Sequence, residues 1–370
     1  MTSTDSDRLA RLLSYLDADP LNPALLTEAV EAAIAGGDLD RAATLAERLR
    51  EVLPGGFEGA YLGSVIAMRR GDFAGAAGTL EKLLPDHDHP NVRFNLAWSR
   101  AMLGEKRSAL ALLDEATAGA IPAAAMLRVQ LTHEAGDFDA AFALGKAALE
   151  RHPEDAGLLA ATAMLAIDVE EPELAREWAK RAGAHPEALA VSGLLELHDG
   201  EPAAALQMFD RSLAVRDHNP RAWIGRGLAG LAENIPGEAA RDIDRGAQQF
   251  GDHIGSWIAA GWAHFLAGDA EAARQRFERA LALDQNFAES QGSLAALSAL
   301  RGDREEARRR SLVALRLDRE CFTAALAQAL LSETPAKAQD IVAKAMHTPI
   351  NERGLTMMSF MAGISRPTVH

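Results

Sequence analysis

Apolar residues recur at helical spacing in two successive runs within residues 254–284, and a glycine followed by an aspartate separates the runs. The first run places its apolar and aromatic residues on two neighbouring stripes of a helix: Trp257, Ala260, Gly261 and His264 on one, and Ile258, Trp262 and Phe265 on the other. Gly268 tolerates the positive φ that ends a helix, and Asp269 can cap the next helix. The pattern predicts a helix–turn–helix hairpin.

The hairpin pattern recurs along most of the chain. Gly302 and Ala307 lie 34 residues after Gly268 and Ala273. Earlier turns are predicted at Gly37, Gly71, Gly104, Gly136 and Gly200, together with one glycine-free turn near Glu170. We therefore expect about ten units, which start near residues 23, 57, 90, 122, 156, 186, 220, 254, 288 and 319.

A small residue recurs in each predicted second helix, because only a small side chain lets the paired helices approach closely: Ala42, Ala76, Ala109, Ala141, Ala175, Ala205, Ala239, Ala273 and Ala307. This spacing resembles the tetratricopeptide repeat. The copy at residues 254–285 carries the most family positions: Trp257, Gly261, His264 at the tyrosine place, Ala273, Phe277 and Ala280. The resemblance implies an all-α fold, an α-solenoid in which helix–turn–helix repeats form a right-handed superhelix.

One hairpin cannot bury both of its faces, so we expect the copies to stack into one continuous domain without linkers. Residues 1–22 are predicted to form an N-terminal capping helix, residues 23–346 the repeats, and residues 347–370 a C-terminal capping helix and tail. The segment Gly354–Ile364 is rich in methionine and phenylalanine. We expect it to close the last repeat, although it could instead lie in the groove or pair with a second copy of the chain.

Composition narrows the classes of partner. The formal net charge is −15, from 53 acidic and 38 basic residues, which disfavours attraction to phosphate backbones or anionic lipid, so we expect no nucleic-acid partner. No stretch approaches the roughly 20 apolar residues of a membrane span, and the acidic, polar N-terminus differs from a secretory signal. We therefore expect a cytoplasmic protein with no membrane insertion. The single Cys321 is expected to be a buried, inert thiol.

Three motifs have a structural interpretation that we favour over a functional one. "GRGLAG" at residues 225–230 fits a dinucleotide fingerprint, but it lies inside a predicted first helix instead of after a strand. "PDHDHP" at residues 85–90 could offer His87 and His89 to a metal, but a solvated turn is the better interpretation, so no metal or cofactor is expected. The arginines of residues 303–320 are expected to pair with acids, Glu305 with Arg309 and Glu306 with Arg310.

The resemblance implies a non-enzymatic scaffold or adaptor that binds a segment of another protein in the groove of the superhelix. The alternative is a dedicated chaperone or regulatory subunit of one obligate partner, for example a secreted protein or an enzyme. Too few residues lie outside the repeats for a catalytic domain.

If the first helices face the groove, its predicted lining is apolar and would take an apolar or amphipathic segment. The predicted groove residues are Tyr61, Val65, Met68, Phe94, Trp98, Met126, Met164, Ile167, Leu194, Leu197, Ile224, Leu228, Ile258, Trp262 and Phe265. Trp98 and Trp262 are the expected anchors, because aromatic side chains often dominate binding. The alternative is that these residues are ordinary core.

Overall fold

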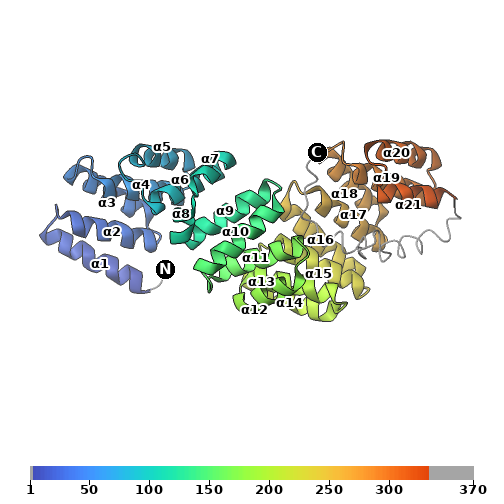
Figure 1. Ribbon diagram of the computed structural model, residues 1–370, viewed down its shortest axis with the longest axis horizontal. Coiled ribbons are helices and arrows are strands. Elements are labelled where there is room, and N and C mark those ends of the chain that lie inside the picture. The colour runs from blue at the N-terminus through green and yellow to red at the C-terminus, as the bar shows by residue number, and fades with distance from the viewer. Residues whose placement is uncertain (1–2, 333–370) are drawn as a thin grey trace. The chain divides into compact units, whose positions relative to one another are not determined.

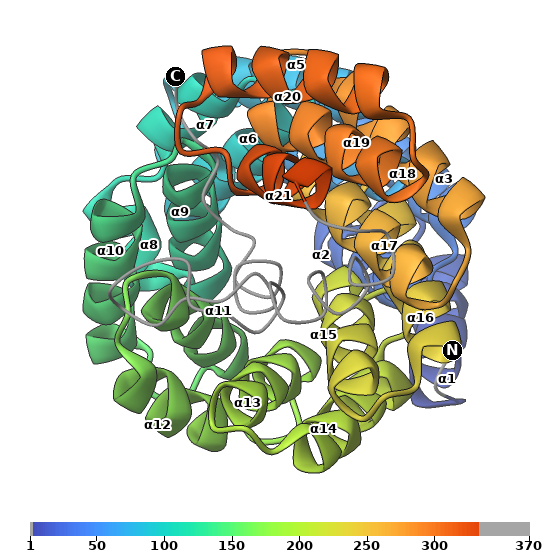
Figure 2. The same ribbon diagram turned by 90° about the vertical axis from the view of Figure 1, so that its right-hand side faces the viewer.

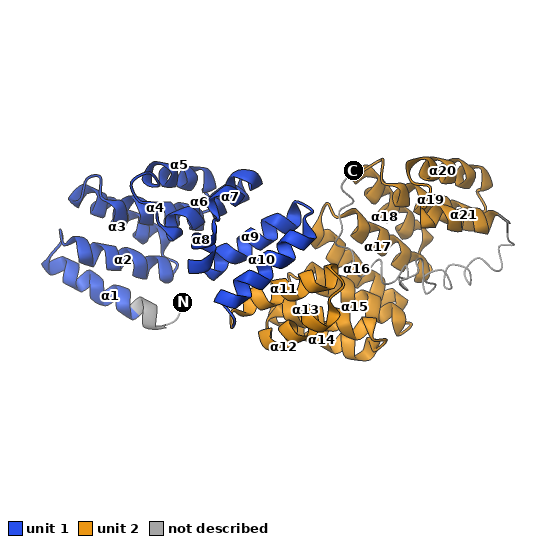
Figure 3. Ribbon diagram, viewed as in Figure 1, with its two compact units in different colours: residues 1–153 blue, residues 154–370 orange. Residues whose placement is uncertain are grey.

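The computed structural model describes residues 3–332, and every regular element in that part of the chain is an α-helix (Figure 1). The sequence-based prediction of an all-α solenoid of helical hairpins is confirmed. By its internal contacts the chain divides into two compact units, residues 1–153 and residues 154–370 (Figure 3). The prediction of one continuous solenoid remains a prediction.

Unit 1 begins with a single helix, which a series of helical hairpins follows. Its helices are α1 (Ser3–Ala18), α2 (Pro23–Ala35), α3 (Leu39–Val52), α4 (Phe57–Arg69), α5 (Phe73–Leu83), α6 (Pro90–Met102), α7 (Lys106–Leu112), α8 (Glu115–Ala120), α9 (Pro122–Glu134) and α10 (Phe138–Arg151). The first helices of its four repeats, α2, α4, α6 and α9, begin at the predicted residues 23, 57, 90 and 122. Helix α1 buries Leu9, Leu12 and Leu16 in the core that it shares with α2.

Unit 2 continues the same alternation in its described residues. Its helices are α11 (Ala156–Asp168), α12 (Pro172–Ala182), α13 (Pro186–His198), α14 (Pro202–Val215), α15 (Pro220–Ala232), α16 (Pro236–Phe250), α17 (Ile254–Leu266), α18 (Ala270–Leu283), α19 (Ala288–Leu300), α20 (Arg304–Leu317) and α21 (Phe322–Ser332). Within this unit the first helices α13, α15, α17, α19 and α21 form one layer and the second helices the other (Figure 2). The tenth repeat begins at Phe322 instead of residue 319.

Positive φ angles mark the predicted turns between the two helices of a repeat. Gly37, Gly71, Gly104, Gly136, Gly200, Gly268 and Gly302 all have φ between +78° and +86°. The predicted glycine-free turn is confirmed, because Glu170 takes the same place with φ +63°. Asn234 does so at φ +60° in the repeat that begins at residue 220. A positive φ is unfavourable for a non-glycine residue, so the backbone at these two positions is strained.

Close helix contacts explain the small residues. The nine recurring alanines are at most 1% exposed. A Cβ on Gly225 would lie 2.3 Å from the ring of Phe209, and one on Gly227 would lie 2.5 Å from Ile243, so these helices could not keep their spacing with larger residues. The motif "GRGLAG" lies inside α15, as predicted, and its first two glycines serve packing.

The second helix of the third repeat departs from the regular pattern, because it is split into α7 and α8. The backbone leaves the helix at Leu113, which is buried, and Asp114 starts α8 by accepting a hydrogen bond from the Thr117 amide at 2.8 Å. Asp114 also lies 3.4 Å from Arg93 at the start of α6. A helix–turn–helix unit of two helices was expected here.

Two predictions concern residues outside those that the structure describes. The proposed closing helix at residues 354–364 lies there, and so does the second half of the tenth repeat.

Candidate interaction surface

In unit 1 the predicted groove residues lie on three first helices and keep part of their surface accessible. Tyr61, Val65 and Met68 on α4, Phe94 and Trp98 on α6, and Met126 on α9 are all half-buried. Partial burial holds each side chain in place while leaving apolar area for a ligand. This combination is expected of an interaction surface and not of a sealed core.

Ring contacts fix the geometry of the α4 and α6 residues. The Phe57 and Tyr61 rings stack with centroids 5.2 Å apart, and Phe94 and Trp98 lie 6.3 Å apart. The Asn95 side-chain amide donates a hydrogen bond to the Tyr61 hydroxyl at 3.0 Å, which joins the two helices. Burial raises the pKa of Tyr61, and the hydrogen bond from Asn95 offsets part of that effect. Tyr61 is therefore a neutral phenol at physiological pH.

Met102 extends this surface and was not predicted. It lies one turn beyond Trp98 on α6 and is 53% exposed. The signal was present in the sequence, because Phe94, Trp98 and Met102 are spaced at i, i+4 and i+8. We define the unit 1 face as Tyr61, Val65, Met68, Phe94, Trp98 and Met102.

Unit 2 differs, because many of its predicted groove residues are core. Five are at most 9% exposed: Met164, Ile224, Leu228, Ile258 and Trp262. The other four, Ile167, Leu194, Leu197 and Phe265, are half-buried. Trp262 is 1% exposed and packs edge-on against Phe277 with ring centroids 5.3 Å apart. Its expected role as an accessible anchor is therefore corrected: a partner cannot reach a side chain that neighbouring helices enclose.

The loop at residues 85–90 uses its polar side chains within the protein. The His87 ring lies 4.5 Å from that of Phe57, and His89 accepts a hydrogen bond from the Asn91 amide at the start of α6. Arg93 holds both oxygens of Asp88 and thereby lowers the pKa of that carboxyl group. In the described part of the chain no three side chains of the metal-binding types converge.

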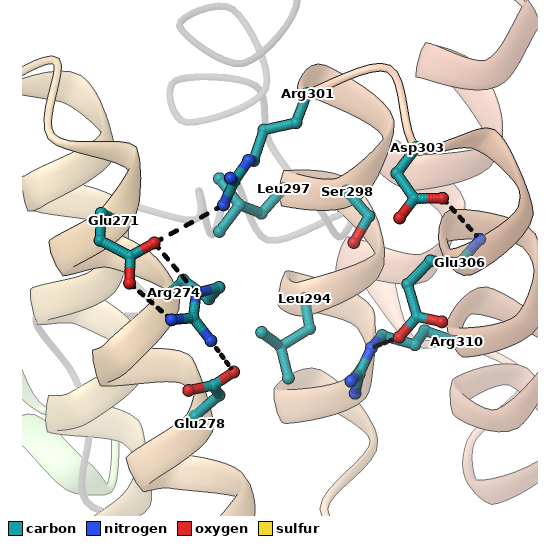
Figure 4. Close-up of a pocket in the computed structure, with 10 residues that line it drawn as sticks. All are labelled: Glu271, Arg274, Glu278, Leu294, Leu297, Ser298, Arg301, Asp303, Glu306 and Arg310. Carbon is teal, nitrogen blue, oxygen red and sulfur yellow. Dashed lines mark hydrogen bonds and ion pairs between the residues drawn. The ribbon is translucent and has the colours of Figure 1, made fainter.

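A groove of about 560 Å³ lies in unit 2 between α18, α19 and α20 (Figure 4). The buried Leu294 and Leu297 supply its apolar lining. The charged side chains at its rim neutralise one another, because Arg274 forms ion pairs with Glu271 and Glu278 of the same helix. Ser298 is the sole hydroxyl among the ten lining residues, and no histidine lies beside it to act as a base. The groove has no catalytic arrangement.

An internal ion-pair network joins α16, α17 and α18 in unit 2. Asp244 accepts hydrogen bonds from His264 at 2.8 Å and from Arg276 at 2.6 Å and 3.0 Å. Burial works to raise the pKa of Asp244, but these hydrogen bonds outweigh it and hold that pKa below its ordinary value. The carboxylate, imidazole and guanidinium groups supply hydrogen-bond partners to one another. The network therefore stabilises the contact between the repeat that ends with α16 and the repeat formed by α17 and α18.

The prediction that Cys321 is buried is confirmed. It is 1% exposed, and burial raises its pKa to about 12. Nearby, Glu289 accepts hydrogen bonds from the backbone amides of Phe322 and Thr323 and so caps α21. This cap was not predicted, because it joins residues that lie 33 and 34 positions apart in the sequence.

Comparison with known proteins agrees with this geometry. Residues 27–92 and 190–253 match the family model of the tetratricopeptide repeat. The predicted resemblance is confirmed: these two regions match tetratricopeptide repeats. Such repeats generally mediate protein–protein interactions. The regular elements of the described residues are all helices, with no separate catalytic domain among them.

Solved structures with the same fold include IFIT1. The human IFIT1 dimer with PPP-AAAA is 12% identical, with 98% of this chain and 90% of that chain covered and a TM-score of 0.57. A monomeric IFIT1 mutant with Gppp-AAAA is 10% identical, with 93% and 95% covered and a TM-score of 0.55. At this identity the likeness shows the fold alone. No curated protein sequence matches the chain.

These structures correct one expectation from the sequence. Net charge was used to exclude a nucleic-acid partner, yet a helical solenoid of this fold is seen with PPP-AAAA. The exclusion of a nucleic-acid partner was therefore wrong, because the net charge of a chain does not report the charge that lines one surface.

The search for membrane-spanning segments found none: within the described residues, every helix is too short or too polar to cross a membrane.

Proposed function

We propose that the chain is a non-enzymatic interaction protein whose unit 1 face binds an apolar or amphipathic segment of a partner protein. The observation that carries the proposal is the partial exposure of six apolar side chains on two adjacent first helices, α4 and α6. A contiguous apolar surface of this kind is costly in water and commonly marks an interaction site.

The residue types favour an adaptable apolar ligand. Trp98, Phe94 and Tyr61 offer large rigid rings, and aromatic side chains provide much of the affinity at protein interfaces. Met68 and Met102 have flexible thioether side chains, which adjust to ligands of different shape. The hydrogen bond from Asn95 to Tyr61 fixes the spacing of α4 and α6. The methionine side chains can therefore change conformation on a surface whose helices stay in place.

The direct test measures binding of a defined peptide. A peptide selected from a displayed random library on the full chain is labelled with fluorescein and titrated by fluorescence anisotropy. Trp98→Ala is expected to weaken binding by about 2 kcal/mol, roughly thirtyfold in Kd, while helical content by circular dichroism is kept. Val215→Ala removes a 60% exposed apolar side chain from α14 and is the matched control.

Equal binding by wild type and Trp98→Ala would place the site on another face. PPP-AAAA is titrated in parallel. Binding of that oligonucleotide, with no peptide recovered from the library, would contradict the proposal and favour a nucleic-acid partner.

A further inference from the structure

Helix α20 carries a local positive charge on an acidic protein. It contains five arginines and two glutamates, which leaves three net positive charges, the most of any helix among the described residues. The whole chain has a formal net charge of −15. An anionic ligand repelled by most of the protein would be attracted here.

The same helix exposes an unusual amount of apolar surface. Leu312 is 56% exposed, Leu317 41% and Val313 38%, and these are three of the ten large apolar side chains exposed in the described residues. The inward face of the helix is formed by other residues, Ala307, Ser311 and Ala314, which are all buried.

Arginines and apolar residues share two rows along this outer side. Residues four apart on a helix are neighbours, so Arg308, Leu312 and Arg316 form one row, and Arg309, Val313 and Leu317 form the other. We define the α20 face as these six residues. A ligand that lies along the helix would meet two arginines at the first turn, two apolar side chains at the next, and one of each at the last.

The charges of this face are only partly neutralised. Glu306 binds both Arg309 and Arg310, so the expected Glu306–Arg310 pair is confirmed, whereas Arg309 pairs with Glu306 instead of the expected Glu305. Arg304 donates to the Leu331 carbonyl. No ion pair joins Arg308 or Arg316 to an acid within residues 3–332.

We propose that the α20 face binds an acidic amphipathic segment of a partner protein. Carboxylates would pair with Arg308 and Arg316, and apolar side chains would cover Leu312, Val313 and Leu317. The site is distinct from the unit 1 face and independent of the function proposed for it. At physiological ionic strength the screening length for electrostatic interactions is about 8 Å. A single segment bound along α20 would therefore interact mainly with the local positive charge. An anionic bilayer extends beyond one helix and would also meet the acidic remainder of the protein.

The test uses an 18-residue fluorescent peptide of leucine and glutamate, with the leucines at i, i+4 spacing, titrated into the full chain. Arg308→Glu combined with Arg316→Glu is expected to weaken binding at least tenfold, and Leu312→Ser at least threefold. The charge-matched control is Arg211→Glu combined with Arg241→Glu, two exposed arginines on α14 and α16, and it is expected to bind as wild type does. Circular dichroism checks folding, and Arg308→Gln with Arg316→Gln provides a milder variant.

Loss of binding in the α20 variants together with normal binding in the control supports the proposal, and so does weaker binding at 0.5 M salt. No binding to wild type, or an equal loss in the control, overturns it. Vesicles of phosphatidylserine and phosphatidylcholine are tested in the same way. Binding to them through Arg308 and Arg316, with no binding of the peptide, would overturn it in favour of a lipid surface.

Discussion

Trp262 lies on α17 with its ring against Phe277, and Phe277 in turn fills the space beside Gly261, where a Cβ would lie 2.3 Å from that ring. The three residues form an interlocked contact between the two helices of one repeat. Trp262 Nε1 is buried and has no hydrogen-bond partner among the described residues. The side chain therefore contributes through its volume and not through its polar group.

Truncation of Trp262 is expected to destabilise the fold. Trp262→Ala would leave a large cavity and lower the free energy of unfolding by about 3–5 kcal/mol. Trp262→Phe keeps most of the apolar contact and removes the unpartnered N–H, so it is expected to cost much less. Urea denaturation followed by circular dichroism measures both variants. A Trp262→Ala protein as stable as wild type would mean that the side chain is not core.

Helical phase predicted which residues share a side of each first helix, but not how deeply they are covered. Trp98 and Trp262 occupy equivalent positions in their repeats, yet one is half-buried and the other enclosed. The difference depends on neighbours from other helices. In unit 2 a phenylalanine of α18 meets Trp262, whereas in unit 1 the second helix of the Trp98 repeat is shortened and followed by α8. Periodicity within one helix contains no information on such contacts.

Helix α17 begins at a histidine cap. The Nδ1 atom of His253 accepts a hydrogen bond from the Ser256 amide at 3.3 Å and lies 2.5 Å from the Ser256 hydroxyl. Burial, assisted by the positive charge of Arg221, lowers the pKa of His253 from 6.5 to about 4. The neutral imidazole is therefore the form that the folded protein favours, and only that form can accept the capping hydrogen bond.

This cap predicts a pH dependence of stability. The unfolded chain binds more protons than the folded one between pH 6.5 and about 4, so the stabilisation is complete above pH 6.5 and is lost as the pH falls towards 4. The full difference is on the order of 3 kcal/mol. His253→Asn keeps a capping acceptor without the titration, so its urea midpoint is expected to fall less than that of wild type between pH 7 and 5. Parallel midpoints for the two proteins would contradict this account.

At the scale of elements the sequence was informative where its signal was local. The starts of nine first helices matched their predicted residues, because proline, capping residues and turn glycines lie within a few positions of each start. The split between α7 and α8 was not predicted, since it involves the Arg93–Asp114 contact from another helix. The cap of α21 by Glu289 was missed for the same reason.

At the scale of the whole molecule, the sequence predicted an array of repeats but not the different character of the two units. Unit 1 leaves aromatic and methionine side chains accessible on α4 and α6, whereas unit 2 encloses many of the equivalent residues. The net charge of −15 likewise conceals the positive charge of α20. Averages over a chain of 370 residues do not describe single surfaces.

The proposed function rests on the claim that a partner segment binds on the unit 1 face. Amide hydrogen exchange of the full chain, measured by mass spectrometry with and without the saturating library-selected peptide, tests it most directly. We predict slower exchange in α4 and α6 on binding, and unchanged exchange in α15 and α17. Protection confined to the helices of unit 2, with α4 and α6 unaffected, would contradict the claim.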